Sequence, residues 1–140
     1  MYWQDKLTLR SFGRGTYEIT KDIEKMIRDS GVQQGLCHLF IQHTSASLII
    51  SENADPAVRD DLETFISKIC PDGDAMFTHR SEGDDDMPAH IRTMLTQTEI
   101  TIPVKTGNSG LGAWQGVYMW EHRIASHQRY VLVTIHGQSS

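Results

Sequence analysis

The chain has 140 residues, of which 39% are hydrophobic and 22% charged, and its formal net charge is −5. This length and balance are typical of one soluble globular domain that can bury a sizeable core. The negative charge and the lack of a basic stripe argue against a nucleic-acid partner, and no apolar run reaches the ~18 residues needed to cross a membrane.

The cysteines and the N-terminus together indicate a compartment. Cys37 and Cys70 lie on apolar-patterned segments and share no CxxC spacing. Such cysteines are usually buried free thiols in a cytoplasmic protein, which we favour over a disulfide or a metal pair. Residues 1–6 have neither a basic nor an apolar signal-peptide region. We therefore expect a cytoplasmic protein with no membrane partner.

The first half of the chain alternates between strand and helix patterns. Strands are predicted at residues 4–11, 16–19, 36–42 and 48–50. A short amphipathic helix is expected between the second and third strands, with Thr20 as its N-cap and Gly31 at its end.

A second helix carries the strongest start signal in the chain. Asp55 can serve as its N-cap, and Pro56 follows at the first helical position. Pro71 ends the segment. Its apolar residues recur at helical spacing and give the helix one apolar face, made by Val58, Leu62, Phe65, Ile66 and Ile69.

The second half predicts one more helix and three strands. Asp86 or Met87 is expected to cap the helix, with its apolar residues at Ile91, Met94 and Leu95. The strands are predicted at residues 100–104, 117–120 and 130–135, with a glycine-rich loop over 107–112. Helices and strands do not alternate as βαβ units, so we predict an α+β fold: a single domain over residues 1–140 with a largely antiparallel sheet and about three helices.

The segment 79–90 departs most clearly from ordinary scaffold. His79 and His90 bracket four carboxylates, a set of donors that suits divalent metals and phosphorylated ligands. The two histidines are eleven positions apart, so a shared ligand requires the loop to fold back. His43, at the end of a core strand, is the natural third metal ligand. The alternatives are two solvated histidines and a half-buried, hydrogen-bonded His43.

The acidic residues of this segment offer a second kind of metal site. Asp85 and Asp86 lie next to the helix start and to His90, and they could hold Mg²⁺ against a diphosphate. The alternative is a solvated acidic loop with one helix cap, which we prefer for Asp84. The metal is therefore expected to be divalent, of the zinc or magnesium class.

A third group of candidates follows the glycine-rich loop. Gly112 could let backbone N–H groups approach a phosphate, although a β-turn explains the glycines equally well. The indole of Trp114 could stack on a heterocycle, and the carboxamide of Gln115 could bind its ring nitrogens. Trp114 as an ordinary packing residue is an equally good interpretation. Glu121 and Arg123 lie two apart on a strand, so they could simply pair with each other.

Three blocks of sequence resemble the YjbQ-like proteins, whose members carry the label secondary thiamine-phosphate synthase. The blocks are HTSASL at 43–48, DDDMPAH at 84–90, and GAWQG at 112–116 followed by EHR at 121–123. They occur in the order and spacing of that family, and the resemblance covers essentially the full length. It implies a compact α+β fold with a sheet pseudo-barrel, and a homotrimer with polar pockets near subunit boundaries.

The resemblance also implies an activity and a set of site residues. The activity is the weak synthesis of thiamine phosphate, in which a thiazole phosphate displaces diphosphate from a pyrimidine methyl diphosphate. The resemblance implies that the His and acidic positions of these blocks form the site. Together with the residue patterns, it gives three groups of candidates: catalytic Asp86, Glu121 and Gln115; ligand-binding Ser45, Asp85, Trp114, Gly112 and Arg123; and metal-binding His43, His79 and His90. Glu121 would act as a general base or metal ligand, and Ser45 would hydrogen-bond the ligand.

The sequence departs from the family pattern at three positions. Ser109 stands where relatives usually carry an aliphatic residue, Ala113 where they carry Thr, and Arg80 where they often carry an acid. The first two bear on the shape of the glycine-rich loop.

Three functions follow from these observations. The first is a metal-assisted transferase acting on phosphorylated heterocycles, of the thiamine-phosphate synthase type, with the metal offsetting charge on the departing diphosphate. The second is a metal-dependent hydrolase of a small phosphorylated or anionic metabolite, in which Glu121 or Asp86 activates water. The third is a trimeric module that binds a small anion without turnover, which ligand-dependent thermal stabilisation without product would reveal.

Overall fold

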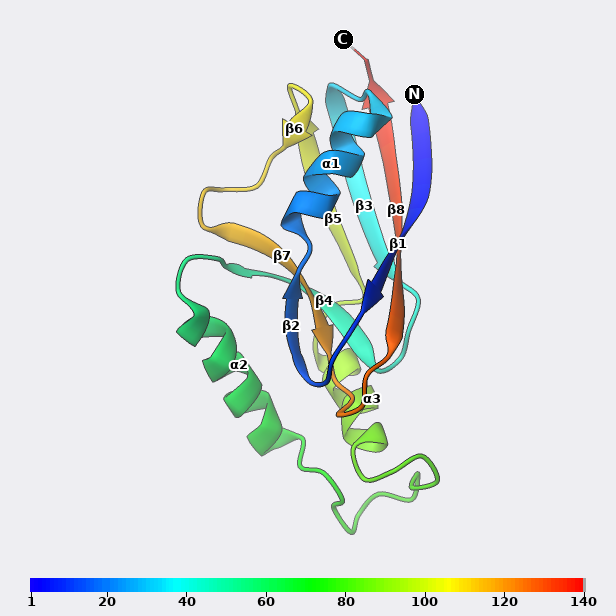
Figure 1. Cartoon of the computed structure of the whole chain (residues 1–140), viewed down its shortest axis with the longest axis vertical. Helices are drawn as coiled ribbons and strands as arrows, with labels where there is room; N and C mark the ends of the chain where they lie inside the picture. Colours follow the sequence, from blue (N-terminus) through cyan, green and yellow to red (C-terminus); the bar gives the residue numbers. More distant parts are fainter. Residues whose placement is uncertain (140) are drawn as a thin grey trace.

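A computed structural model describes residues 1–139 (Figure 1). The elements, in chain order, are β1 Tyr2–Arg10, β2 Gly15–Glu18, α1 Thr20–Ser30, β3 Gln34–Ile41, β4 Ala46–Glu52, α2 Pro56–Ile69, α3 Asp86–Leu95, β5 Glu99–Lys105, β6 Asn108–Ser109, β7 Gln115–Glu121 and β8 Gln128–Gln138. Every strand pairing is antiparallel. The predicted α+β fold with three helices is confirmed. The short strand β6 was not predicted, because its two residues lie inside the glycine-rich loop.

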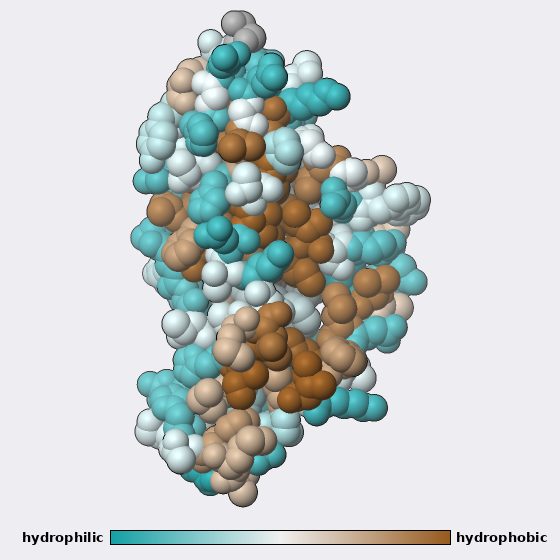
Figure 2. All heavy atoms as spheres, turned by 180° about the vertical axis from the view of Figure 1, so that it is seen from behind, coloured by the Kyte–Doolittle hydropathy of each residue, from teal (hydrophilic) through white to brown (hydrophobic). Residues whose placement is uncertain are grey.

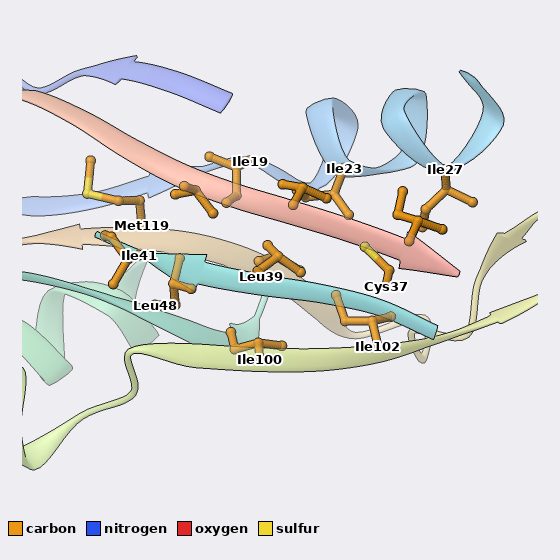
Figure 3. Packing of buried hydrophobic residues seen from close by; sticks show 14 of the residues in the cluster. Ile19, Ile23, Ile27, Cys37, Leu39, Ile41, Leu48, Ile100, Ile102 and Met119 are labelled. Carbon is orange, nitrogen blue, oxygen red and sulfur yellow. The ribbon is translucent and has the colours of Figure 1, made fainter. Parts of the chain in front are cut away.

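The strands form two sheets that face each other. One sheet has the order β1-β8-β3-β5-β6 and the other the order β2-β7-β4. Alternating residues of each strand point between them, as Leu39 does from β3 and Met119 from β7. Helix α1 adds Ile23 and Ile27 to the same cluster (Figure 3). The hydrophobic core therefore lies between the two sheets and under α1.

The remaining helices cover the other face of the three-stranded sheet. A second, smaller apolar cluster joins Ile66 and Cys70 of the α2 segment to Trp120 of β7. Cys37 and Cys70 are both buried and free, as predicted. None of the helices in residues 1–139 combines the length and the apolar character needed to span a bilayer.

Helix boundaries follow the sequence signals where those signals are local. Asp55 caps α2 as predicted, because its carboxylate accepts a hydrogen bond of 3.0 Å from the backbone N–H of Ala57. The predicted cap at Thr20 is wrong: Ile19 occupies the N-cap position, and the Thr20 hydroxyl instead accepts from the N–H of Val117 on β7. Asp85, rather than Asp86 or Met87, is the cap residue of α3.

Helix α3 buries only part of the face that its apolar residues predict: Ile91 packs against the second apolar cluster, but the other two residues do not. Met94 and Leu95 are 73% and 53% exposed, whereas Arg92 is fully buried. The Arg92 guanidinium donates to Glu63 at 2.6 Å and to Ser67 at 3.0 Å, both on α2. An ion pair with α2 therefore decides which face of α3 points inward.

One face of the five-stranded sheet carries no helix. Figure 2 shows apolar surface running down the middle of the back of the molecule, from this sheet to the end where α3 lies. Leu36 and Phe40 of β3 are each 41% exposed, and they face the same side as Leu132 of β8. This uncovered sheet face therefore exposes apolar side chains between charged ones, because Lys6 is paired with Leu132 and Glu99 with Phe40.

Candidate functional site

The two histidines of segment 79–90 meet at one carboxylate, because the loop before α3 folds back. The Nε2 atom of His79 lies 2.6 Å from Oδ2 of Asp86, and Nε2 of His90 lies 3.1 Å from the same oxygen. Ligand atoms of the three side chains all lie within 4.8 Å of one another. Together His79, Asp86 and His90 form what we call the His–Asp cluster.

The local sequence explains how this cluster forms. Asp86 and His90 are one helical turn apart at the start of α3, so their side chains lie on the same face. His79 returns to them because the loop turns at Gly73 and Gly83, whose φ angles of +68° and +105° favour glycine. The guanidinium of Arg80 donates to two carbonyls of the same loop and holds it in place.

A backbone contact fixes the proton on His90. Its Nδ1 atom lies 2.8 Å from the carbonyl oxygen of Thr44, which can only accept a hydrogen bond. Nδ1 therefore carries the proton, and the Nε2 atom of a neutral ring presents a lone pair to Asp86. A metal-binding histidine is held in the same way, by donating its other ring N–H to a carbonyl.

The Asp86 carboxylate is buried and surrounded by positive partners. Arg123 contacts its second oxygen, Oδ1, at 2.8 Å, and also binds Asp85 at 2.9 Å. Burial alone would raise the pKa of Asp86, but the hydrogen bond from His79 and the charge of Arg123 help to outweigh it and lower the pKa. The same balance lowers the pKa of Asp85, where Arg123 outweighs burial. Both groups are carboxylates at neutral pH.

The structure places His43 elsewhere than the predicted metal site. Its Nε2 atom accepts a hydrogen bond of 2.8 Å from the backbone N–H of Tyr130, and its Nδ1 atom faces Arg129. The ring also stacks on Tyr130 with centroids 5.8 Å apart. The third member of the cluster is therefore Asp86 and not His43.

Glu121 lies in a buried ion pair instead of facing a ligand. Its carboxylate binds the Nε and Nη2 atoms of Arg129 and accepts from the hydroxyl of Ser11 at 2.6 Å. Burial would raise the pKa of Glu121, but the hydrogen bonds from Arg129 and Ser11 outweigh it and lower the pKa. Ser45 belongs to the same network, because its hydroxyl and carbonyl accept from Arg129. The suggested pairing of Glu121 with Arg123 is limited to a backbone N–H contact.

The glycine-loop candidates lie at the other end of β7. Gln115 begins this strand and Glu121 ends it, which separates the two positions by about 20 Å at ~3.3 Å per residue. Trp114 is 67% exposed, and the Gln115 carboxamide accepts from the N–H of Gly112 at 2.7 Å. Within one chain, these three residues cannot contact a small molecule that is bound at the His–Asp cluster.

Sequence reasoning missed two partners of the site. Arg129 is buried, yet it occupies an inward position on β8, in line with Val131, Val133 and Ile135. A charged residue in that apolar alternation was a usable signal of a buried ion pair. The carbonyl of Thr44 could not be found in this way, because every residue carries the same group.

The structure contains two cavities of interest, a small one beside His79 and a larger one away from the candidate site residues. A space of about 10 Å³, enough for roughly one water molecule, is lined by His79, Phe77 and Met87 among others. A larger cavity of about 660 Å³ lies at the far end of the five-stranded sheet, between Gln34 and Lys105. No predicted site residue lines the larger one.

Comparison with known proteins identifies the family of this chain. The family described as UPF0047 protein YjbQ-like matches residues 5–138. The chain belongs to the YjbQ-like family. A UPF0047 protein of Synechocystis sp. is 47% identical over 135 residues, which cover 96% of this chain and 92% of the relative. The UPF0047 protein YjbQ of Escherichia coli O157:H7 is 41% identical over 139 residues, covering 99% of this chain and all of the relative.

Solved structures of YjbQ-like proteins share the fold. A crystal structure from Sulfolobus solfataricus P2 superposes with a TM-score of 0.90 over 99% of both chains, at 22% identity. A structure of a family member from Clostridium acetobutylicum has a TM-score of 0.86 and 31% identity, covering 94% of this chain and 99% of that one. The fold implied by the sequence resemblance is thereby confirmed.

Proposed function

We propose that this YjbQ-like chain is a metal-dependent enzyme that acts on a small phosphorylated metabolite. The observation that carries the proposal is the His–Asp cluster, in which two imidazole nitrogens and one buried carboxylate oxygen converge. We assign His79, Asp86 and His90 as the metal ligands.

A bound divalent metal explains the arrangement of these donor atoms better than a cluster without a metal does. With its proton on Nδ1, the ring of His90 directs a lone pair at an ionised carboxylate oxygen 3.1 Å away. Two acceptors facing each other are repulsive unless a cation or an additional proton lies between them. The Arg123 guanidinium and the Thr44 carbonyl would support the site from outside, because each orients one of the ligands.

The ligand types favour zinc over magnesium. Two imidazole nitrogens and one carboxylate, with further positions left for water or substrate, are typical of catalytic zinc sites. Magnesium usually takes oxygen ligands only. Such a metal would supply Lewis-acid stabilisation of negative charge on phosphate oxygens.

Transfer of the thiamine-phosphate synthase type is the first reaction that we propose, on the strength of the family resemblance. In this chain Arg123 would hold Asp85 and Asp86 in place beside the departing diphosphate. Trp114 and Gln115 would bind a heterocycle only if a neighbouring subunit supplied them, because in one chain they lie at the far end of β7.

Hydrolysis is a second candidate, and one observation favours it. The cavity of about 10 Å³ beside His79 has room for roughly one water molecule, which is the only co-substrate that hydrolysis requires. Product analysis with and without the thiazole phosphate separates the two reactions.

We further propose that the protein is a cytoplasmic homotrimer. Two buried free thiols suit a reducing compartment, and the uncovered sheet face gives the subunits an apolar surface to share. A trimer that binds a small anion without turnover would be a non-catalytic binding module.

The decisive experiment measures metal content in protein purified without an affinity tag or a chelator. We expect close to one metal per chain in the parent and its loss in a folded His90→Ala variant. His136→Ala is the matched control, because His136 is an exposed histidine on β8 and should leave the metal content unchanged. Equal metal content in His90→Ala and the parent, or none in either after zinc loading, would overturn the assignment.

A further inference from the structure

A contact between His43 and Arg129 brings two hydrogen-bond donors together. His43 Nε2 accepts from the backbone N–H of Tyr130 at 2.8 Å, so that nitrogen carries no proton. In a neutral imidazole the proton is then on Nδ1. Nδ1 lies 3.4 Å from Nη1 of Arg129, which is itself only a donor. The contact is therefore donor against donor and is no hydrogen bond.

The Nη1 atom of Arg129 thus lacks an acceptor among the described residues, although the side chain is 5% exposed. Its other nitrogens are well occupied: Nε and Nη2 bind Glu121, and Nη2 also binds Ser45. A buried guanidinium N–H without an acceptor is costly, and such groups normally find one.

An oxygen atom placed between the two nitrogens would satisfy both donors. It could accept from His43 and Arg129 at ordinary hydrogen-bond lengths of ~2.8 Å, because the nitrogens are 3.4 Å apart. Burial and the charge of Arg129 both lower the pKa of His43, which keeps the ring neutral and Nδ1 protonated at neutral pH.

The surroundings favour a negatively charged oxygen. Arg129 offers a charged donor, for which an anion is the stronger acceptor. The ammonium of Lys6 lies 4.8 Å from the ring centre of Tyr130, on which His43 also stacks. The charge of Glu121 on the same guanidinium opposes a bound anion, but both of its oxygens are already bound, so Glu121 does not itself satisfy Nη1.

We infer that His43 Nδ1 and Arg129 Nη1 form an oxyanion site that takes one oxygen of a phosphate or carboxylate group. The site is connected to the His–Asp cluster through the backbone, because the residue after His43 is Thr44, whose carbonyl contacts His90. In an active site it would bind the charged group of the substrate. Its place in an active site rests on the proposed function, whereas its affinity for an oxyanion does not require a metal.

The test is a titration of the isotope-labelled full-length protein, freed of metal with a chelator, followed by NMR of side-chain nitrogens. Inorganic phosphate and acetate are the two probes, and a response to either supports the site and identifies the preferred oxyanion. We expect saturable shifts of the His43 ring N–H and of the Arg129 guanidinium. No saturable shift at either residue with either probe would overturn the inference and leave water as the bridging acceptor.

A variant that removes a single donor sharpens the test. In His43→Gln a side-chain oxygen can still accept from the N–H of Tyr130, while the Nδ1 donor is gone. We expect its oxyanion affinity to fall about tenfold or more, the usual effect of losing a charge-assisted hydrogen bond. His127→Gln, at a nearby histidine whose Nδ1 faces the carbonyl of Ala125, should bind as the parent does. Unchanged affinity in folded His43→Gln would also overturn the inference.

The metal-free arm separates this inference from the proposed function. Oxyanion binding by the chelator-treated protein, together with no metal in the metal-content experiment after zinc loading, would support the site at His43 and refute the metal enzyme. Metal binding without an oxyanion response would do the reverse.

Discussion

At the scale of single residues, the hydrogen-bond partner of a side chain determines where its proton lies and therefore what it can bind. His90 and His43 are both half-buried histidines, yet their surroundings impose opposite roles on them. The Thr44 carbonyl makes Nε2 of His90 an acceptor that suits a cation. The Tyr130 N–H makes Nδ1 of His43 a donor that suits an anion. The hydrogen-bond partner of the second ring nitrogen therefore decides what each ring can bind.

His122 provides a prediction at the same scale. The ring is fully buried and bonded to the hydroxyl of Ser47 at 2.8 Å, and burial together with nearby arginines lowers its pKa from 6.5 to about 3. Below pH 6.5 the unfolded chain takes up a proton on His122 that the folded protein refuses until about pH 3. Stability therefore falls as the pH falls through this window, by up to about 1.4 kcal/mol per pH unit from this group.

We expect a His122→Gln variant to lose this part of the pH dependence. The measurement is the free energy of unfolding in urea between about pH 7 and pH 5, above the range in which carboxylates titrate. His127→Gln should keep the slope of the parent. If His122→Gln has the same slope as the parent, the buried ring does not stay neutral as described.

At the scale of whole elements, local chemistry predicts where a helix starts better than which face it buries. Helix α2 begins where Asp55 and Pro56 place it, because a cap acts on N–H groups two residues away. Helix α3 leaves Met94 and Leu95 exposed and buries Arg92, which bonds Glu63 on α2, 29 residues earlier in the chain. No pattern within α3 contains that partner.

The candidate site residues also divide into those placed by local sequence and those placed by contacts between distant segments. His79, Asp86 and His90 could be predicted together because they belong to one loop and one helical turn. The metal role predicted for His43 depended on a contact across the molecule, and the N–H of Tyr130, 87 residues later, occupies the nitrogen in question. The separation of Trp114 from Glu121 was predictable in principle, since Trp114 directly precedes β7, Glu121 ends it, and a strand has a known rise per residue.

The cap of α2 gives a direct test of this local control. Asp55→Ala removes the acceptor for the Ala57 N–H, and we expect the free energy of unfolding to drop by about 1 kcal/mol. Asp55→Asn keeps a side-chain oxygen at the same place and should stay close to the parent. Equal losses in both variants, measured by urea unfolding, would show that charge rather than capping is responsible.

At the scale of the whole molecule, we propose that the uncovered sheet face mediates assembly of the proposed trimer. We expect Phe40→Arg to convert the assembly to monomers in sedimentation experiments, because it replaces the exposed apolar side chain beside Leu132 with a charged one. Phe65→Arg on α2 is the matched control, since Phe65 is 65% exposed and belongs to an element that covers the other sheet. A parent protein that sediments as a monomer would refute the trimer.

The pairing of β1 with β8 also has a kinetic consequence. The register joins Tyr2 to His136 and continues to Arg10 and Gln128, while the other edge of β8 pairs with β3. The five-stranded sheet therefore stays incomplete on the ribosome until residues 128–138 have emerged. Until then, the edges of β1 and β3 that pair with β8 have unpaired backbone groups. Such distant pairings slow folding and expose edges that other chains can join. Synthesis that stalls before β8 should therefore produce an aggregation-prone nascent chain rather than a smaller folded domain.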